Sequence, residues 1–142
     1  MNLNRLLLSQ PHWPNLGLLL LRFATGSLMC YLHGWSKLFA GTDRWGKLGS
    51  GLSQLLGVDI LSIPFGFMAS FAESIAALFI TIGFYTRPSA FLLAFTMMVA
   101  VSKKIPGGLR EAELPLLFLT LSLGILFLGG GRFSVDAFLN KK

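Results

Sequence analysis

Four long apolar stretches constrain this chain more than any other feature of its sequence. The stretches cover residues 16–38, 63–83, 88–105 and 113–130. About 20 apolar residues let an α-helix span a bilayer, and a helix satisfies its backbone hydrogen bonds internally, as the hydrocarbon core requires. The sequence therefore predicts an all-α, integral membrane four-helix bundle that forms a single membrane domain over residues 1–142.

The connections between the stretches predict the order of the helices. The second and third connections are short, so the helices that they join must be antiparallel neighbours. This arrangement gives an up-down-up-down bundle with both termini on the same side of the membrane. The third stretch is the shortest, and we expect Lys103 and Lys104 to extend it by reaching toward the membrane surface.

The composition agrees with a membrane protein. Charged residues make up only 13% of the chain, against about 25% in an average soluble domain. The 12 basic and 6 acidic residues give a net charge of +6. Most basic residues stand singly or in pairs outside the apolar stretches, which is typical of anchors to lipid headgroups and not of a nucleic-acid site. They divide almost equally between the two predicted sides, so charge does not decide the orientation.

Cysteine usage restricts the redox chemistry of the chain. Cys30 is the only cysteine. A lone cysteine excludes an intrachain disulfide, a Cys-x-x-Cys pair and a cysteine-ligated iron–sulfur cluster. Any redox chemistry must therefore use a cofactor borrowed from outside the chain.

The long first connection is predicted to contain an amphipathic helix at the membrane interface, over residues 43–58. Its apolar side chains recur at the spacing of one helical face, at Trp45, Leu48, Leu52, Leu55 and Leu56. Four glycines in the same segment lower its helix propensity, so an irregular loop is the alternative. The tail, residues 132–142, is also expected to lie at the interface.

The few ionisable side chains inside the apolar stretches are the main candidates for function, because each is costly in a bilayer. Arg22, His33 and Lys37 lie on one stripe of the first helix. In the second helix, Glu73 has an alanine four residues away on either side, and such small residues let another helix approach. We therefore expect the first two helices to pack through these faces with an Arg22–Glu73 ion pair. The alternative is that this pair only fixes the helix register.

A second group of ionisable residues is predicted to meet at the end of the bundle away from the termini. There, His33 and Lys37 approach the end of the third helix and the start of the fourth, which carry Lys103, Lys104, Glu111 and Glu113. The glutamates also fit a structural role, because acidic side chains stabilise a helix N-terminus. His33 equally fits an interfacial histidine bonded to the backbone. We expect no metal site, because His33 has no second histidine within the membrane.

Gly26, Cys30 and Gly34 form a row of small residues beside the ionisable stripe. Such a row lets two helix backbones approach closely. It could serve the contact with the Glu73 helix or a contact between protomers of a homo-oligomer. We expect the internal contact, because the row adjoins Arg22 and His33, whose polar groups must be hidden from lipid.

Several motifs resemble the DoxX family of small four-helix membrane proteins. They are residues 20–26 (LLRFATG), 33–39 (HGWSKLF), Glu73, residues 83–88 (GFYTRP) and residues 131–136 (GRFSVD). The resemblance extends from Leu18 to Leu139. It implies a four-helix fold, the cytoplasmic (inner) membrane of a bacterium or archaeon, and association with redox systems. Founding members are subunits of a thiosulfate-oxidising, quinone-reducing complex, but the family is heterogeneous, and fold transfers better than activity.

Together, the residues and the resemblance predict a membrane subunit that binds a quinone or a similar hydrophobic molecule within the bundle. It would work with a soluble or membrane oxidoreductase, and we expect both termini in the cytoplasm. A quinone needs an apolar slot, a hydrogen-bond donor and a group that handles protons. His33 would be the donor and Glu73 the proton-handling carboxylate, with Arg22 keeping Glu73 ionised. Lys37 and Glu113 complete the predicted ligand-binding set.

A second interpretation needs no electron transfer. The same cavity would then belong to a non-catalytic assembly module, or to a carrier of a lipid-like or small hydrophobic molecule. Nothing in the sequence decides between the two interpretations.

Overall fold

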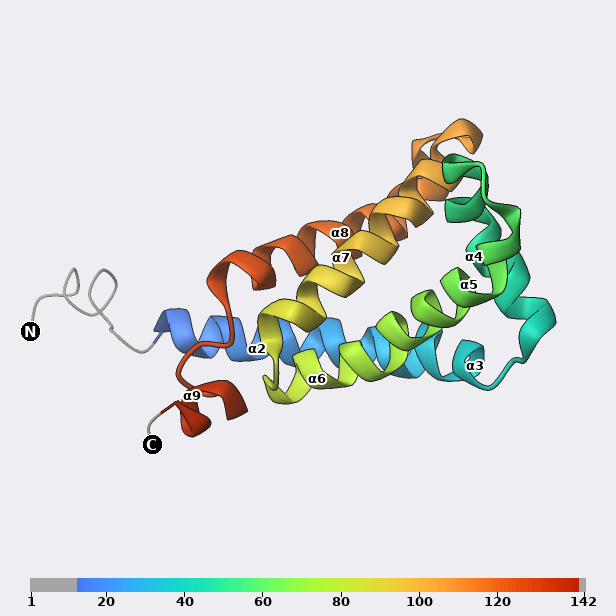
Figure 1. Cartoon of the computed structure of the whole chain (residues 1–142). Coiled ribbons are helices and arrows are strands. Elements are labelled where there is room, and N and C mark those ends of the chain that lie inside the picture. Colours follow the sequence, from blue (N-terminus) through green and yellow to red (C-terminus); the bar gives the residue numbers. More distant parts are fainter. Residues whose placement is uncertain (1–12, 141–142) are drawn as a thin grey trace, which may run out of the picture.

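Four long helices form most of the computed structural model, which describes residues 13–140 (Figure 1). Their bounds are Trp13–Leu38, Asp59–Ile82, Thr86–Gly107 and Leu109–Leu128, and each is long and apolar enough to cross a membrane. No strand occurs in the range from residue 13 to residue 140. The predicted all-α fold with four spanning helices is therefore confirmed, and each helix begins two to four residues earlier than predicted.

The long helices are built from shorter helical elements. The first contains α2 (Trp13–Leu28), the π-helical turn η1 (Met29–Gly34) and α3 (Trp35–Leu38). The second contains the 3₁₀ turn η2 (Asp59–Leu61), α5 (Ser62–Phe71), the π-helical turn η3 (Ala72–Ala76) and α6 (Ala77–Ile82). The third comprises α7 (Thr86–Lys104) and the 3₁₀ turn η4 (Ile105–Gly107), and the fourth is α8 (Leu109–Leu128). Two other helices are α4 (Thr42–Leu56) and α9 (Val135–Leu139).

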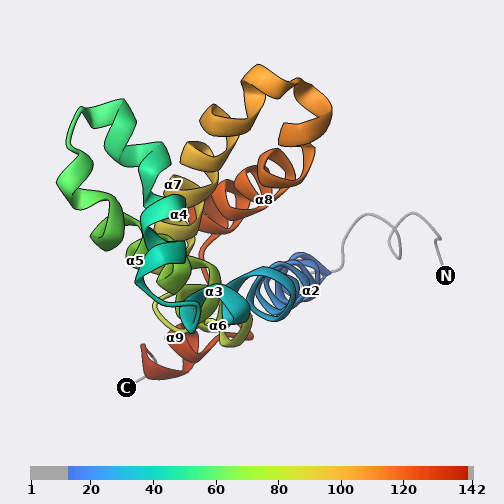
Figure 2. The ribbon, with the colours of Figure 1, turned by 90° about the vertical axis from the view of Figure 1, so that its right-hand side faces the viewer.

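Successive long helices run in opposite directions, as predicted (Figure 1). They share one hydrophobic core, to which the four helices contribute Met29, Ile80, Leu93, Phe118 and Ile125. The helices pack together at the end that holds the turn between α6 and α7. Toward the other end, the pair α4 and α5 diverges from the pair α7 and α8 (Figure 2).

Glycines bring the first two long helices into backbone contact. A Cβ atom at Gly34 would overlap the backbone carbonyl of Glu73, and a Cβ atom at Gly26 would lie 2.8 Å from the backbone nitrogen of Thr81. A side chain at either position would therefore force the helices apart. The internal contact predicted for the small-residue row is confirmed.

The helix predicted in the first connection is present as α4, and it packs against α5. Gly49 and Gly66 allow the two backbones to meet, because a Cβ atom at Gly49 would overlap the Ser62 carbonyl and one at Gly66 would overlap the Trp45 carbonyl. Gly49 lowers the helix propensity of this segment, which favoured an irregular loop, but the packing of α4 against α5 requires a glycine at this position. The position of α4 at the membrane interface remains a prediction.

The segment after α8 folds back onto the start of α7. The carboxylate of Asp136 accepts hydrogen bonds from the backbone nitrogens of Tyr85 and Thr86, both at 2.8 Å, and from the Thr86 hydroxyl at 2.6 Å. Asp136 therefore caps α7 from a distant part of the chain, since a helix N-terminus leaves its first N–H groups without partners. Residues 141–142 of the predicted interfacial tail lie outside the described residues, and the membrane position of the rest of the tail remains a prediction.

Replacing Gly26 with leucine is expected to destabilise the protein by at least about 1–3 kcal/mol, the usual cost of overpacking. The matched control is Gly17→Leu in the same helix, because nothing lies within 4 Å of a Cβ atom at Gly17. Circular dichroism during denaturation in mild detergent measures the stability, and size-exclusion chromatography measures the oligomeric state. A folded Gly26→Leu protein that had only become smaller would show that the row joins protomers instead.

Candidate functional site

A cavity of about 800 Å³ lies between the pair α4 and α5 and the pair α7 and α8. Its walls are mostly apolar, and α4 contributes Leu48, Leu52, Leu55 and Leu56. These leucines are part of the helical face that predicted α4, so this face borders the cavity. The volume falls within the range of about 300–1,000 Å³ that is usual for small-molecule sites.

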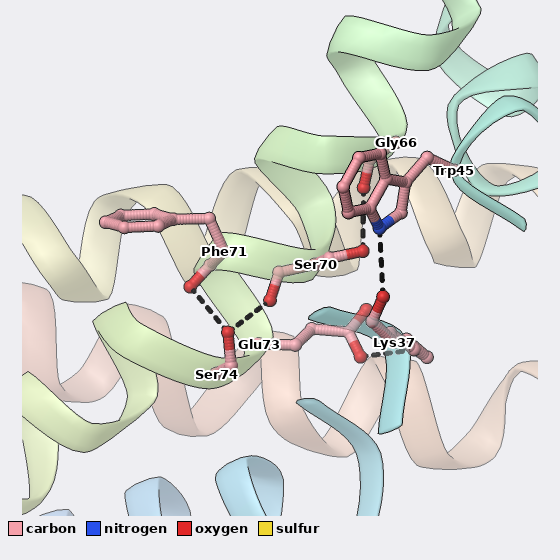
Figure 3. A network of polar contacts seen from close by, with 7 residues as sticks. All are labelled: Lys37, Trp45, Gly66, Ser70, Phe71, Glu73 and Ser74. Atoms are coloured by element: carbon pink, nitrogen blue, oxygen red, sulfur yellow. Dashed lines mark hydrogen bonds and ion pairs between the residues drawn. The ribbon is translucent and has the colours of Figure 1, made fainter. Parts of the chain in front are cut away.

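Three of the predicted site residues line this cavity together, namely His33, Lys37 and Glu73. We call them the floor. Lys37 Nζ forms an ion pair with the Glu73 carboxylate, and the two side chains are 21% and 6% exposed, respectively (Figure 3). The floor therefore places a largely shielded pair of opposite charges beside apolar walls.

The two π-helical turns carry two of the floor residues. His33 belongs to η1 and Glu73 to η3, and the two turns touch where Gly34 meets the Glu73 backbone. A π-helical turn holds an extra residue in the helix and often marks a functional site. Ser74 Oγ donates a hydrogen bond of 2.6 Å to the Ser70 carbonyl (Figure 3), so a hydroxyl supplements the backbone bonding of η3.

Trp45 connects the floor to α4. Its indole nitrogen donates a hydrogen bond of 2.9 Å to the Lys37 carbonyl (Figure 3). Its ring also meets Phe67 of α5 edge to face, with centroids 5.1 Å apart. Trp45 therefore ties the end of the first long helix, which carries Lys37, to both helices of the α4–α5 pair.

His33 connects the floor to α8. Its ring meets Phe118 edge to face, with centroids 6.1 Å apart. A neutral imidazole has one donor and one acceptor nitrogen, and the Lys37 ammonium is a donor only. The floor can thus offer hydrogen-bond donors to a polar ligand group and a carboxylate that can exchange protons with it.

The predicted Arg22–Glu73 ion pair is wrong. Arg22 is fully buried, but its guanidinium donates hydrogen bonds to the Phe133 carbonyl at 2.7 Å and to the Ile80 carbonyl at 3.4 Å. Arg22 therefore holds the segment after α8 against the bundle. It takes no part in the cavity.

The register of the antiparallel helices explains this difference. Because Gly34 lies beside Glu73, Arg22 lies farther along the helix pair, beside Gly83. The ten residues from Glu73 to Gly83 correspond to about 15 Å along a helix. This separation exceeds the reach of an arginine side chain.

The predicted gathering of charges around His33 and Lys37 is only partly present. Lys103 and Lys104 line the cavity with them, but Glu113 lines a separate hollow on α8. Glu111 lies in the first turn of α8, close to where a Gly107 side chain would be, which agrees with its structural alternative. The structure thus brings neither Glu113 nor Arg22 to the floor.

Two features of the site escaped the sequence analysis. The Lys37–Glu73 pairing was missed, although Lys37 follows His33 by one helical turn on the same stripe and so carried a usable signal. The role of Trp45 was also missed, because it depends on how α4 packs. Within residues 13–140, no group of three or more His, Cys, Asp or Glu side chains could hold a metal ion.

Comparison with known protein families identifies the family of this chain. The DoxX family model matches residues 17–103, which is more than half of the sequence. The chain belongs to the DoxX family. No curated protein and no solved structure is significantly similar to it.

The DoxX match contains the whole floor. It ends at residue 103, so α8 and the motif at residues 131–136 lie beyond it, although the resemblance noted in the sequence extended to Leu139. With four helices that are long and apolar enough to cross a membrane, this DoxX protein is an integral membrane protein.

The ion pair in the floor predicts non-additive mutational effects. Lys37→Met and Glu73→Gln are each expected to destabilise this DoxX protein by about 3 kcal/mol, because each leaves a poorly solvated charge without its partner. The double variant should lose less than the sum, as measured by denaturation in mild detergent. As a control, Arg22→Met and Glu73→Gln should have additive effects, because these residues do not touch. Additivity between Lys37 and Glu73 would contradict the pair.

Proposed function

We propose that this DoxX protein binds a quinone, or a hydrophobic molecule with a similar polar ring, in its cavity. The observation that carries the proposal is the combination of extended apolar walls with a small polar floor. Apolar side chains such as Met29, Met68 and Phe118 border the cavity and suit a hydrocarbon tail. A polar ring gains its orientation from the few polar groups that converge on it, as is usual in ligand sites.

The floor residues have complementary roles in this proposal. Reduction of a quinone to a quinol consumes electrons and protons in equal number. Lys37 and His33 are candidates to donate hydrogen bonds to ring oxygens, and Glu73 is the candidate to exchange protons with them. Lys37 is the ion-pair partner of Glu73, the position that was predicted for Arg22.

A partner oxidoreductase, soluble or membrane-bound, supplies or removes the electrons in this proposal, as the DoxX resemblance implies. We place the protein in the cytoplasmic membrane of a bacterium or archaeon, with both termini in the cytoplasm. The alternative function is that of a carrier, which binds the same class of molecule and transfers no electrons. Reduction of bound quinone by the host's membrane fraction favours the redox function, and binding without reduction favours the carrier.

Quinone retention tests the site itself. Protein extracted from its native membrane in mild detergent is expected to carry quinone that liquid chromatography and mass spectrometry detect. Glu73→Gln should retain about tenfold less, because it removes the charged acceptor for a hydroxyl of the reduced, quinol form. His33→Phe should retain several-fold less, because it removes a neutral donor to a ring oxygen. A hydrogen bond to a charged group is worth about 1.5–3 kcal/mol and one between neutral groups about 0.5–1.5 kcal/mol, and 1.4 kcal/mol is a factor of ten.

Glu113→Gln is the matched control, because it makes the same chemical change outside the cavity. It should retain as much quinone as the unmodified protein. Equal retention by Glu73→Gln and Glu113→Gln would contradict the proposed site.

A further inference from the structure

Three lysines at the edge of the cavity have no role in the proposed quinone site. Lys47 of α4 and Lys103 and Lys104 of α7 line the cavity, and all three are exposed. We call them the rim. Among residues 13–140, Glu73 is the only acidic residue that lines the cavity, and it is paired with Lys37. The rim charges therefore have no acidic counterpart in the cavity lining.

Lys103 reaches across the cavity mouth from α7 to α4. Its ammonium donates hydrogen bonds to the Lys47 carbonyl at 3.2 Å and to Ser50 Oγ at 3.1 Å. Its stem passes over Gly51, where a Cβ atom would lie 3.2 Å from Lys103 Cδ. Both acceptors are neutral, and hydrogen bonds to an anionic oxygen are about twice as strong. An anion at the rim can therefore take over the bonds of Lys103.

The cavity walls that continue from the rim are apolar. Leu52, Leu55 and Leu56 follow Lys47 along α4, and Val99 precedes Lys103 on α7. A free anion gains nothing from these walls, and a neutral quinone gains nothing from the rim. Positive charge beside an apolar cavity is instead complementary to one molecule that has an anionic head and a hydrocarbon chain.

We propose that the rim binds the phosphate of an anionic membrane phospholipid, and that one of its acyl chains enters the cavity along α4. The head of this lipid contacts Lys47 and Lys103, with Lys104 beside them. The inference goes beyond the quinone site, because it depends on the rim and not on the floor. It assigns the outer part of the cavity to a component of the surrounding bilayer.

Native mass spectrometry of the detergent-solubilised protein, mixed with equal amounts of phosphatidylglycerol and phosphatidylcholine, tests the headgroup. The protein is expected to carry mainly phosphatidylglycerol, and the Lys47→Gln/Lys103→Gln variant should carry about tenfold less of it. Arg44→Gln/Arg110→Gln is the matched control, because it removes the same charge at two exposed arginines that do not line this cavity. Equal losses in the two variants, or no preference in the unmodified protein, would overturn the headgroup site.

A second variant tests the acyl chain. Leu52→Trp narrows the cavity without changing charge and should also lower phosphatidylglycerol retention, provided that circular dichroism shows it to be folded. A folded Leu52→Trp protein with full lipid retention would overturn chain insertion. If Leu52→Trp does not fold, glycerol 3-phosphate is added as a competitor to the lipid-loaded protein. A headgroup without acyl chains should not displace phosphatidylglycerol. Displacement would overturn chain insertion.

The rim variant also separates this inference from the proposed function. Lys47→Gln/Lys103→Gln should lose phosphatidylglycerol and keep its quinone, since its floor is intact. Failure of the quinone experiment leaves the lipid result unchanged, and the reverse also holds.

Discussion

The backbone contact between Gly34 and Glu73 determines the rest of the structure. It occurs where the π-helical turns of the first two long helices meet, and it exists only because Gly34 has no side chain. Two helices in contact at such a point have their register fixed, since a shift by one residue would drive a Cβ atom into the opposite backbone. The position of each charged side chain along the helix pair follows from that register.

The register gives two cations of one helical stripe different roles. Lys37 lies beside Glu73 and helps to form the floor of the cavity. Arg22 lies beside Gly83, and its two terminal guanidinium nitrogens donate hydrogen bonds to the carbonyls of Ile80 and Phe133. An exposed charge in hydrocarbon would be expensive, and the structure avoids this cost once with an ion pair and once with backbone acceptors. The first solution leaves an ion pair at the cavity, and the second joins the segment after α8 to the bundle.

The sequence predicted features that depend on local periodicity. The spans, the leucine face of α4 and the small-residue row all follow from spacing along one helix. The partner of Glu73 could not be predicted in this way, because it depends on how two helices align. Depths estimated from the ends of apolar stretches carry errors of a few residues, and each π-helical turn shifts the residues that follow it along the helix. The predicted place of Glu113 in the ligand-binding set was wrong for a different reason. Glu113 shares a hollow on α8 with Leu117 and Thr120, whereas Leu114 and Phe118 of the same helix border the cavity.

The cap on α7 has a consequence for how the protein assembles. Asp136 bonds to the first residues of α7, and Phe133 receives the buried guanidinium of Arg22. Both residues are synthesised after all four spans. During synthesis, α7 therefore enters the membrane with its N-terminus uncapped, and Arg22 lacks its shorter hydrogen bond. Residues 133–136 thus add a second connection between the first helix and the α6–α7 turn, which already meet where Gly26 lies against Thr81, and this connection can form only after the fourth span has been synthesised.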